Sequence, residues 1–364
     1  METLTATISQ AFSLSLGGVL GTVPEPAFEL SYNGKSITAD IAPFVASISY
    51  EDRMEGEADS LDVTLDDADN RWIKEWYPGK GASLSYRYGY RHKPLAPAGS
   101  FDIDEIEPSG PPDTVRIRAL AAGVQRSVRT RQGRAYEKTT LEAIAKRIAK
   151  RNRMQLVGKF ERVPIDRATQ YQESDLSFLH RLSAQYGYAF KIVENNKRMV
   201  FWKTADLYGG NAIKNYGKSD LSGWHLRDKV ADVPKAVTTR YHNRRRKKRV
   251  TATVSANQTD KSGKATSADT VKITRRAPTK ASAEVQARAE MERRQLDRTG
   301  GEIRLEGDES VSAGTVIALK EDFGKLAGKY LVIRVRHTHT RNGGYTMTLE
   351  LKRVPLPPPK GKKK

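Results

Sequence analysis

A short acidic segment from Asp66 to Asn70 carries side-chain oxygens that could bind a calcium ion. A calcium-binding loop of the EF-hand type needs a glycine at its sixth position and a bidentate glutamate at its twelfth. Counted from Asp67, these two positions hold Trp72 and Pro78, so the segment does not fit such a loop. Because Asp and Asn also favour turns, we interpret the segment as a β-turn rich in carboxylates.

Two histidines, His337 and His339, are a second candidate for metal binding. They lie two residues apart on a predicted strand, so their side chains face the same side. A structural zinc site needs four ligands and a catalytic site three, and no third ligand is identifiable near this pair. His180, beside Arg181 on a predicted helix, is interpreted as a surface or interface residue rather than a general base. We therefore expect no metal, no cofactor and no enzymatic activity.

A third candidate is a run of six consecutive cations, Arg244, Arg245, Arg246, Lys247, Lys248 and Arg249. Phosphate contacts made by such a run would depend strongly on salt and not on nucleotide sequence. The run contains no aromatic side chain to stack on a base, and no nucleic-acid-binding signature surrounds it. We interpret it as a contact for an acidic partner or a polyanion, or as a solvated loop, in preference to a dedicated nucleic-acid site.

The composition limits the classes of protein that can carry these residues. The chain has 364 residues, more than one hydrophobic core usually organises, so two to four domains are expected. Its 63 Lys and Arg outnumber 43 Asp and Glu, and the net charge of +20 favours acidic partners or polyanions without specifying a fold. Cysteine is absent, which excludes disulfides and thiolate metal sites and suits a reducing cytoplasm.

Neither end of the chain has the pattern of a membrane or secretion signal. No stretch of the sequence is apolar for long enough to span a bilayer. Residues 1–26 contain no Lys or Arg, which a secretory signal needs near its start, so we interpret them as an N-terminal arm. Residues 355–364 are rich in Pro and Lys and are predicted to form a disordered basic tail.

Two β-rich regions flank the middle of the chain. In residues 27–125, apolar residues alternate from Phe28 to Tyr32, Asn33-Gly34 predicts a hairpin turn, and more short strands follow. In residues 226–354, predicted strands lie on both sides of a charged helix from Ala281 to Leu296. Many short strands separated by turn residues predict barrels or sandwiches.

The region between them, residues 126–225, has the signals of helices as well as strands. Thr139 begins the pattern of a capping box, and Ser174 can cap a second helix that Gly187 can end. A predicted hairpin from Tyr188 to Trp202 follows, rich in aromatic and β-branched residues. This region is therefore expected to be an α/β unit.

The start of the second predicted helix reads Gln172-Glu173-Ser174-Asp175-Leu176, followed by Phe178-Leu179 and Arg181-Leu182. This segment resembles one shared by phage late control D proteins, the hub proteins of contractile-tail baseplates, and is similar to the amino-terminal hub part of VgrG spike proteins in type VI secretion. Further matches to this family occur in the expected order between Phe28 and Leu351: Ala58-Asp59-Ser60-Leu61, Asp66-Asp67, Trp72, Gly89-Tyr90, Gly99-Ser100-Phe101, Ser109 to Thr114, Gly314, Gly328-Lys329-Tyr330 and His337.

The resemblance implies a fold that is α+β and mainly β, with two similar antiparallel barrel (tube) domains at 27–125 and 226–354 and an α/β insert at 126–225. It also implies a structural homotrimer that adapts the sixfold tail tube to the threefold central spike. Its partners would be copies of itself, the central spike protein, the tail tube protein, the tape measure and other baseplate proteins, with nucleic acid only in transit through the channel. The protein would be assembled in the host bacterial cytoplasm and located in the virion, at the tail baseplate.

Three alternatives stay open at this point. The first is a VgrG-like hub of a secretion device; the chain ends soon after Leu351, which implies a separate spike protein and favours a phage-like tail. The second is a basic nucleic-acid-binding protein, suggested by the net charge alone. The third is an enzyme that degrades cell wall or processes DNA, which the lack of a catalytic set opposes.

Overall fold

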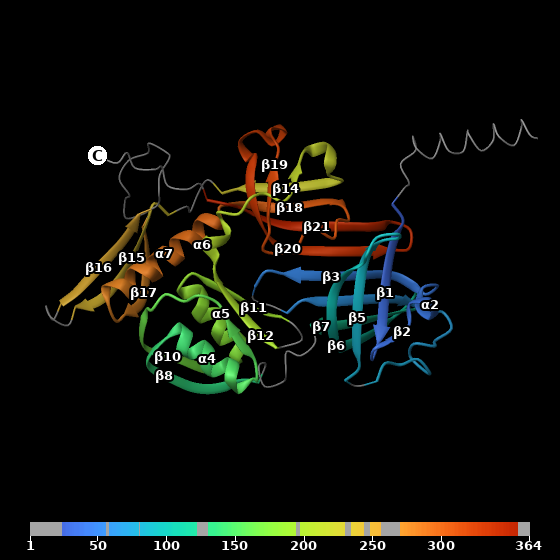
Figure 1. Cartoon of the computed structure of the whole chain (residues 1–364), viewed down its shortest axis with the longest axis horizontal. Coiled ribbons are helices and arrows are strands. Elements are labelled where there is room, and N and C mark those ends of the chain that lie inside the picture. Colours follow the sequence, from blue (N-terminus) through green and yellow to red (C-terminus); the bar gives the residue numbers. More distant parts are fainter. Residues whose placement is uncertain are drawn as a thin grey trace, which may run out of the picture.

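The structure is a computed structural model that describes residues 24–55, 58–79, 81–121, 130–193, 197–229, 234–243, 248–255 and 270–355. Within these ranges the fold is mainly β, as expected, with strands in four sheets and the long helices packed outside the largest one (Figure 1). Among the described residues, no helix is both long enough and apolar enough to cross a membrane.

The amino-terminal set of strands lies in the order β1-β5-β6-β7-β4-β3, and neighbouring strands in it are antiparallel. Side chains alternate between a core and the opposite face, so that Leu61, Val63 and Leu65 of β4 are all buried. The bounds are β1 (Pro26–Tyr32), β3 (Val45–Arg53), β4 (Ser60–Asp66), β5 (Ser83–Tyr90), β6 (Ala96–Ser109) and β7 (Thr114–Ala121), with β2 (Lys35–Ser36) and α2 (Thr38–Ile41) after β1.

The carboxy-terminal set lies in the order β13-β19-β20-β21-β18-β14 and covers a second core that includes Ile303, Leu305 and Leu349. The bounds are β13 (Asn215–Tyr216), β14 (Gly223–Asp228), β18 (Thr299–Glu306), β19 (Val316–Leu319), β20 (Gly328–Thr340) and β21 (Gly344–Arg353), with the 3-10 turns η1 (Lys218–Asp220) and η2 (Glu321–Leu326) between them.

The two sets have the same strand order. Numbered by their place along the chain, the strands of both sets follow the sequence first, fourth, fifth, sixth, third, second. One pairing differs in direction, because β13 runs parallel to β19 whereas β1 runs antiparallel to β5. We refer to these sets below as the N-set and the C-set.

The expected closure into two separate barrels is wrong. β3, at the end of the N-set, pairs with β20 of the C-set, so both sets belong to one 13-stranded sheet. A barrel closes only when its own first and last strands pair, and here the free edge of β3 is used to join the two sets instead. Figure 1 shows β14, β18, β21, β20 and β3 one beneath another.

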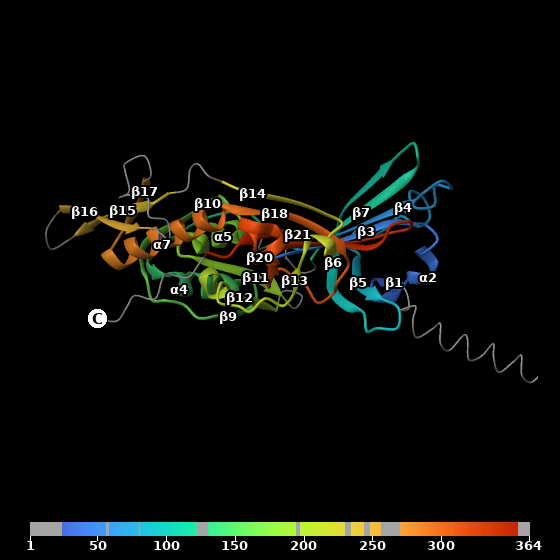
Figure 2. The same cartoon turned by 90° about the horizontal axis from the view of Figure 1, so that it is seen from above.

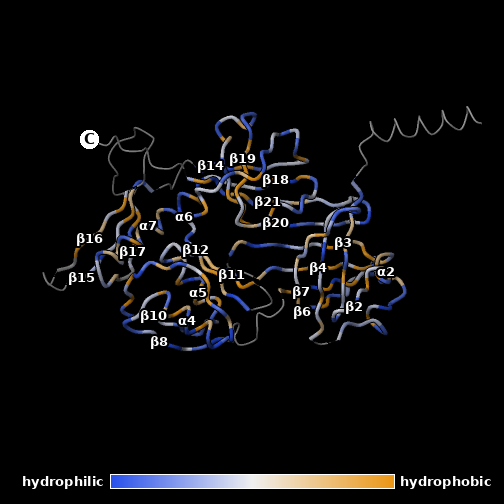
Figure 3. The backbone as a smooth tube through the Cα atoms, in the orientation of Figure 1, coloured by the Kyte–Doolittle hydropathy of each residue, from blue (hydrophilic) through white to orange (hydrophobic). Residues whose placement is uncertain are grey.

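The α/β insert packs two helices on a three-stranded sheet and a two-stranded ribbon. The elements are β8 (Gln132–Thr140), α4 (Leu141–Arg151), β9 (Gln155–Val157), β10 (Pro164–Glu173), α5 (Asp175–Gln185), β11 (Tyr188–Val193) and β12 (Arg198–Lys203), followed by α6 (Thr204–Leu207). Figure 3 shows that β8 is largely hydrophilic whereas β11 and β12 are rich in hydrophobic residues. Phe178, Leu179 and Leu182 of α5 are buried in the core of this unit.

The ends of the insert helices lie where the sequence predicts them, except that the N-cap of α4 is one residue later. Ser174 caps α5, accepting a 3.1 Å hydrogen bond from the N–H of Ser177, and Gly187 after that helix has a φ of +75°, both as predicted. The cap of α4 is Thr140 rather than Thr139, because the Thr140 hydroxyl accepts from the N–H of Ala143. Thr139 instead pairs in the β8–β10 ribbon.

A third unit lies beside the insert. β15 (Ala236–Asn243), β16 (Lys248–Ser255) and β17 (Thr270–Ala277) form a separate three-stranded sheet, and α7 (Lys280–Leu296) packs against it. Figure 2 shows this unit at one end of the molecule, next to α4 and α5 and far from the N-set. These strands do not pair with the large sheet within the described residues.

Candidate assembly site

The seam between β3 and β20 joins the N-set to the C-set. Its register places Arg336 opposite Glu51 and Arg334 opposite Arg53. The buried Glu51 carboxylate accepts a 2.7 Å hydrogen bond from the Arg336 guanidinium and lies 3.7 Å from Arg334. Burial opposes ionisation of Glu51, but the Arg336 hydrogen bond and the nearby arginine charges outweigh it and lower the pKa of Glu51. A cross-strand ion pair therefore reinforces the backbone ladder of the seam.

Beneath the seam lies a buried cluster of histidines and tyrosines. The Tyr86 hydroxyl is 2.9 Å from Nδ1 of His339, and the Tyr345 hydroxyl is 2.8 Å from Nδ1 of His337. The His339 ring also stacks on Tyr345, with ring centroids 4.4 Å apart. Burial lowers the pKa of both histidines to about 4, so both imidazoles are neutral at neutral pH.

The histidine pair links the two strand sets. His337 and His339 lie on β20 and face one core, as their spacing predicted, while Tyr86 belongs to the N-set. Among the described residues, no group of three or more His, Cys, Asp or Glu side chains is placed to hold a metal ion. Three of the four imidazole nitrogens, all except Nε2 of His339, lie within 3.4 Å of a tyrosine hydroxyl, so the arrangement is that of a packed polar cluster across the seam.

A half-buried lysine links the insert to the N-set. The Lys191 ammonium of β11 lies 2.6 Å from Asp52 and 2.9 Å from Asp59. Burial by itself lowers the pKa of Lys191, but the two carboxylates outweigh it and the pKa is raised; burial also raises the pKa of Asp59. Asp52 in addition accepts a 2.8 Å hydrogen bond from the N–H of Ala313, which brings the C-set to the same point.

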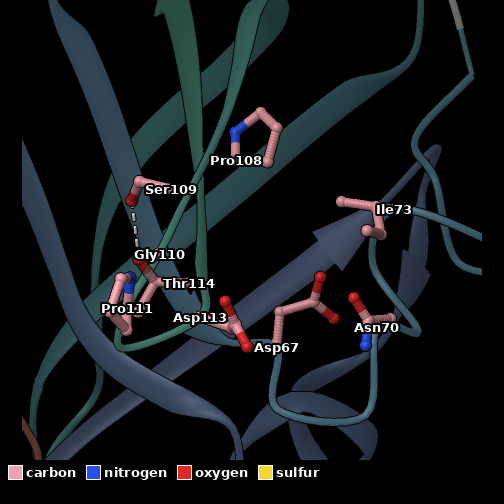
Figure 4. Close-up of a pocket in the computed structure, with 9 residues that line it drawn as sticks. All are labelled: Asp67, Asn70, Ile73, Pro108, Ser109, Gly110, Pro111, Asp113 and Thr114. Atoms are coloured by element: carbon pink, nitrogen blue, oxygen red, sulfur yellow. Dashed lines mark hydrogen bonds between the residues drawn. The ribbon is translucent and has the colours of Figure 1, made fainter.

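The acidic turn lies beside the turn between β6 and β7, where Asp67 and Asp113 line a surface pocket (Figure 4). The N–H of Asn70 donates to the carbonyl of Asp67 over 2.8 Å and closes a β-turn. Asp67 is buried, and its carboxylate accepts a 2.9 Å hydrogen bond from the N–H of Trp72. The interpretation of this segment as a turn is confirmed.

The basic run follows β15 along the chain and ends within β16. Arg244, Arg245, Arg246 and Lys247 are outside the described residues, whereas Lys248 and Arg249 begin β16 and pair with Asn243 and His242. Its role as a partner contact stays a prediction. His180 is half-buried on α5, and the neighbouring Arg181 hydrogen-bonds the carboxylate of Glu173.

Asp175 has more partners than its position in the sequence indicates. It lies in the first turn of α5, where a carboxylate favours the helix dipole. It is completely buried and accepts hydrogen bonds from Arg151, from Asn152 over 3.1 Å and from Gln170 over 2.9 Å. It therefore ties α4, α5 and β10 together at the segment that carried the family resemblance.

This sequence and this fold are similar to those of known phage tail proteins. The chain is 32% identical over 200 residues to a probable baseplate hub protein of Escherichia phage 186, a match that covers 54% of this chain and 49% of the relative. The chain thus spans about half the length of that relative. A solved structure, the 43 kDa tail protein of prophage MuSo2 from Shewanella oneidensis, has a similar fold, with a TM-score of 0.67, 13% identity, and coverage of 90% of this chain and 98% of that one.

A second solved structure has a similar fold. It is the Escherichia coli c3393 protein, described as a component of the type VI secretion system, with a TM-score of 0.54 and 14% identity over 87% of this chain and 77% of that one. The model of the phage tail baseplate hub (GPD) family matches residues 113–343, more than half of the chain. The chain therefore belongs to the phage tail baseplate hub family.

Proposed function

We propose that this protein is the structural baseplate hub of a contractile phage tail or tail-like particle, a homotrimer that adapts the sixfold tail tube to the threefold central spike. The observation that supports this most is the repeated strand order of the N-set and the C-set. Two equivalent units in each chain give six alike surfaces in a trimer. Family membership supports the baseplate, and the virion tail, as the place where the protein acts.

The same proposal assigns the partners and the domains. The hub binds copies of itself, the central spike protein and the tail tube protein, with the tape measure and other baseplate proteins nearby, after assembly in the host cytoplasm. The division into an N-terminal strand domain, an insert and a C-terminal strand domain at 27–125, 126–225 and 226–354 stays a proposal, with the insert at the periphery of the ring. β13 and the first residues of β14 precede residue 226 but pair within the C-set. The role is structural and involves no catalysis, and DNA only passes through the channel.

Light scattering on the purified chain tests this function. We expect a mass three times the 40.6 kDa of one chain, either alone or after mixing with its spike protein. A monomer at high concentration under both conditions would contradict the proposal. A sedimentation assay with the tail tube protein then tests the second contact, because a hub should bind the end of the tube and an unrelated trimer should not.

The second candidate is the hub of a secretion device. It is favoured by the likeness of the fold to the type VI component, which extends over most of this chain. The two candidate functions differ in the tail tube protein that the chain should bind. Binding to a type VI tube protein, and not to a phage tail tube protein, would assign the chain to a secretion device.

A further inference from the structure

The repeat inside the chain extends to the residue level. β6 has a bulge between Ile103 and Glu105, and β20 has a bulge between Val332 and Arg334. Beyond the bulge, Glu105 pairs with Arg118 of β7, just as Arg334 pairs with Glu350 of β21. The bulges therefore align β6 with β20, and Glu107 of β6 takes the place that Arg336 has on β20.

The same alignment carries through the next two strands. Ala119 of β7 corresponds to Leu351 of β21, and these pair with Leu61 and Gly301. Leu61 in turn pairs with Tyr50 of β3, and Gly301 pairs with Leu226 of β14. β14 thus corresponds to β3, and Arg227 takes the place of Glu51.

The equivalents of the seam strands have open edges. β20 and β3 pair with each other, but β14 pairs only with β18, and residues 105–109 of β6 pair only with β7, among the residues that the structure describes. Figure 1 shows β14 at one end of the stack of strands and β6 on the far side of β3. Unpaired strand edges are templates for pairing with another chain.

We infer that β14 of one copy pairs antiparallel with residues 105–109 of β6 of the next copy, repeating the β3–β20 seam between chains. This inference rests on the proposed function, since it supplies the contact through which the trimer would form. Transferring the register of the seam sets Glu107 opposite Arg227 and Glu105 opposite Lys229. All four side chains are exposed, and each pair joins opposite charges.

The charges on these edges admit another role. Charged side chains and proline commonly protect an edge strand from pairing, and Pro108 lies on this edge without an N–H to donate. Protection alone, however, does not require acid on one edge and base on the other at matching positions. In the seam itself, Arg336 and Glu51 form the corresponding ion pair with the charges exchanged. The complementarity therefore favours pairing between copies.

Such a contact is heterologous, because it uses a different surface on each of the two chains. If the contact between chains repeats the rotation between the sets within a chain, successive copies add head to tail, and they close into a ring when six such rotations complete one turn. The six units of a trimer would then alternate N-set and C-set in one continuous sheet.

Disulfide trapping tests the register, and the chain suits it because it has no cysteine. The full chain carrying Glu107→Cys and Arg227→Cys should form covalent dimers and trimers on mild oxidation, reversed by reductant. Glu51→Cys with Arg336→Cys is the matched control, since the same relation lies within one chain and should give an oxidised monomer. Glu105→Cys with His225→Cys lies four residues out of register, roughly 13 Å apart, too far for a disulfide, and should stay uncrosslinked.

Charge exchange gives a second, independent readout. Glu107→Arg or Arg227→Glu alone should weaken association by about fivefold per contact, and the double variant should restore it. Restoration isolates the contact between chains, because a disturbance of the neighbouring Arg116 by Glu107→Arg would persist in the double variant. A stable trimer with no crosslink and no rescue would overturn the edge pairing while leaving the proposed function intact. A chain that stays monomeric would overturn the proposed function as well.

Discussion

Replacing Lys191 with Met should weaken the attachment of the insert to the large sheet. The Lys191 ammonium is the cation that both Asp52 and Asp59 contact, and the side chains of the two carboxylates are 10% and 14% exposed. Without the ammonium they keep backbone donors, the N–H of Ala313 and the N–H of Arg53. Removing one partner of a buried ion pair typically costs 3–5 kcal/mol. We expect about 3 kcal/mol, the lower end of that range, because 24% of the Lys191 side chain remains exposed.

The effect of this substitution should depend on pH. Burial already raises the pKa of Asp59, and loss of Lys191 should raise it further. A carboxyl whose pKa is raised in the folded state favours folding below its unfolded pKa, and this contribution is lost as the pH rises through the folded pKa. The destabilisation should therefore be largest near pH 7 and smaller near pH 4.

Urea unfolding of the wild type and of Lys191→Met at pH 7 and at pH 4 measures the loss in the free energy of unfolding. Lys203→Met is the matched control, since Lys203 also lies in the insert but pairs with the exposed Glu161, and exposed pairs contribute less than about 1 kcal/mol. Adding Asp59→Asn to Lys191→Met should recover part of the loss. If Lys191→Met costs no more than Lys203→Met, or costs the same at both pH values, the proposed role of this lysine is refuted.

Three further outcomes are expected. The free energy of unfolding should fall as the pH drops from 6.5 toward 4, by up to roughly 3 kcal/mol for each of His337 and His339. The reason is that their pKa values are lowered to about 4 in the folded state, so the unfolded chain takes up protons first. A free energy of unfolding that stays constant over this pH range in chemical denaturation would contradict this. Gly301→Ala should disrupt the pairing of β14 with β18, since the φ of Gly301 is +153° and an added Cβ would lie 2.0 Å from a β14 carbonyl oxygen. Gly223→Ala is the control, because a Cβ added there meets nothing within 4 Å. Equal melting temperatures for the two variants would contradict this. Trypsin should cut first between Arg244 and Ser267, at the cations before β16 or among the polar residues after it, because these residues have few apolar side chains to bury. Mass spectrometry of early fragments checks this, and first cleavage between Gln170 and Trp202 would oppose it.

Local signals in the sequence were sufficient for much of the secondary structure. The cap at Ser174, the left-handed glycine after α5 and the turn at Asp67 each depend on residues within a few positions of one another. The displaced cap at Thr140 is an error of one residue, decided by the strand pairing of Thr139 with Ile165. Such a partner is distant in sequence and leaves no local signal.

The contacts that join the units were not predictable in this way. β3 and β20 lie almost three hundred residues apart, and nothing near Glu51 indicates that Arg336 will lie opposite it. The same holds for Lys191 with Asp52, which are 139 residues apart. Alternation along a strand indicates which face is buried, but it does not identify the neighbouring strand. Barrel closure was therefore expected where the structure has one continuous sheet.

A reconstruction of the purified protein by electron cryomicroscopy, calculated without imposed symmetry, tests the central claim most directly. The account predicts a ring of three chains in which N-sets and C-sets alternate, six alike units surround a channel, and β14 of each chain lies against β6 of the next. A particle with a different number of chains, or a trimer whose N-sets and C-sets do not alternate around the channel, would contradict it.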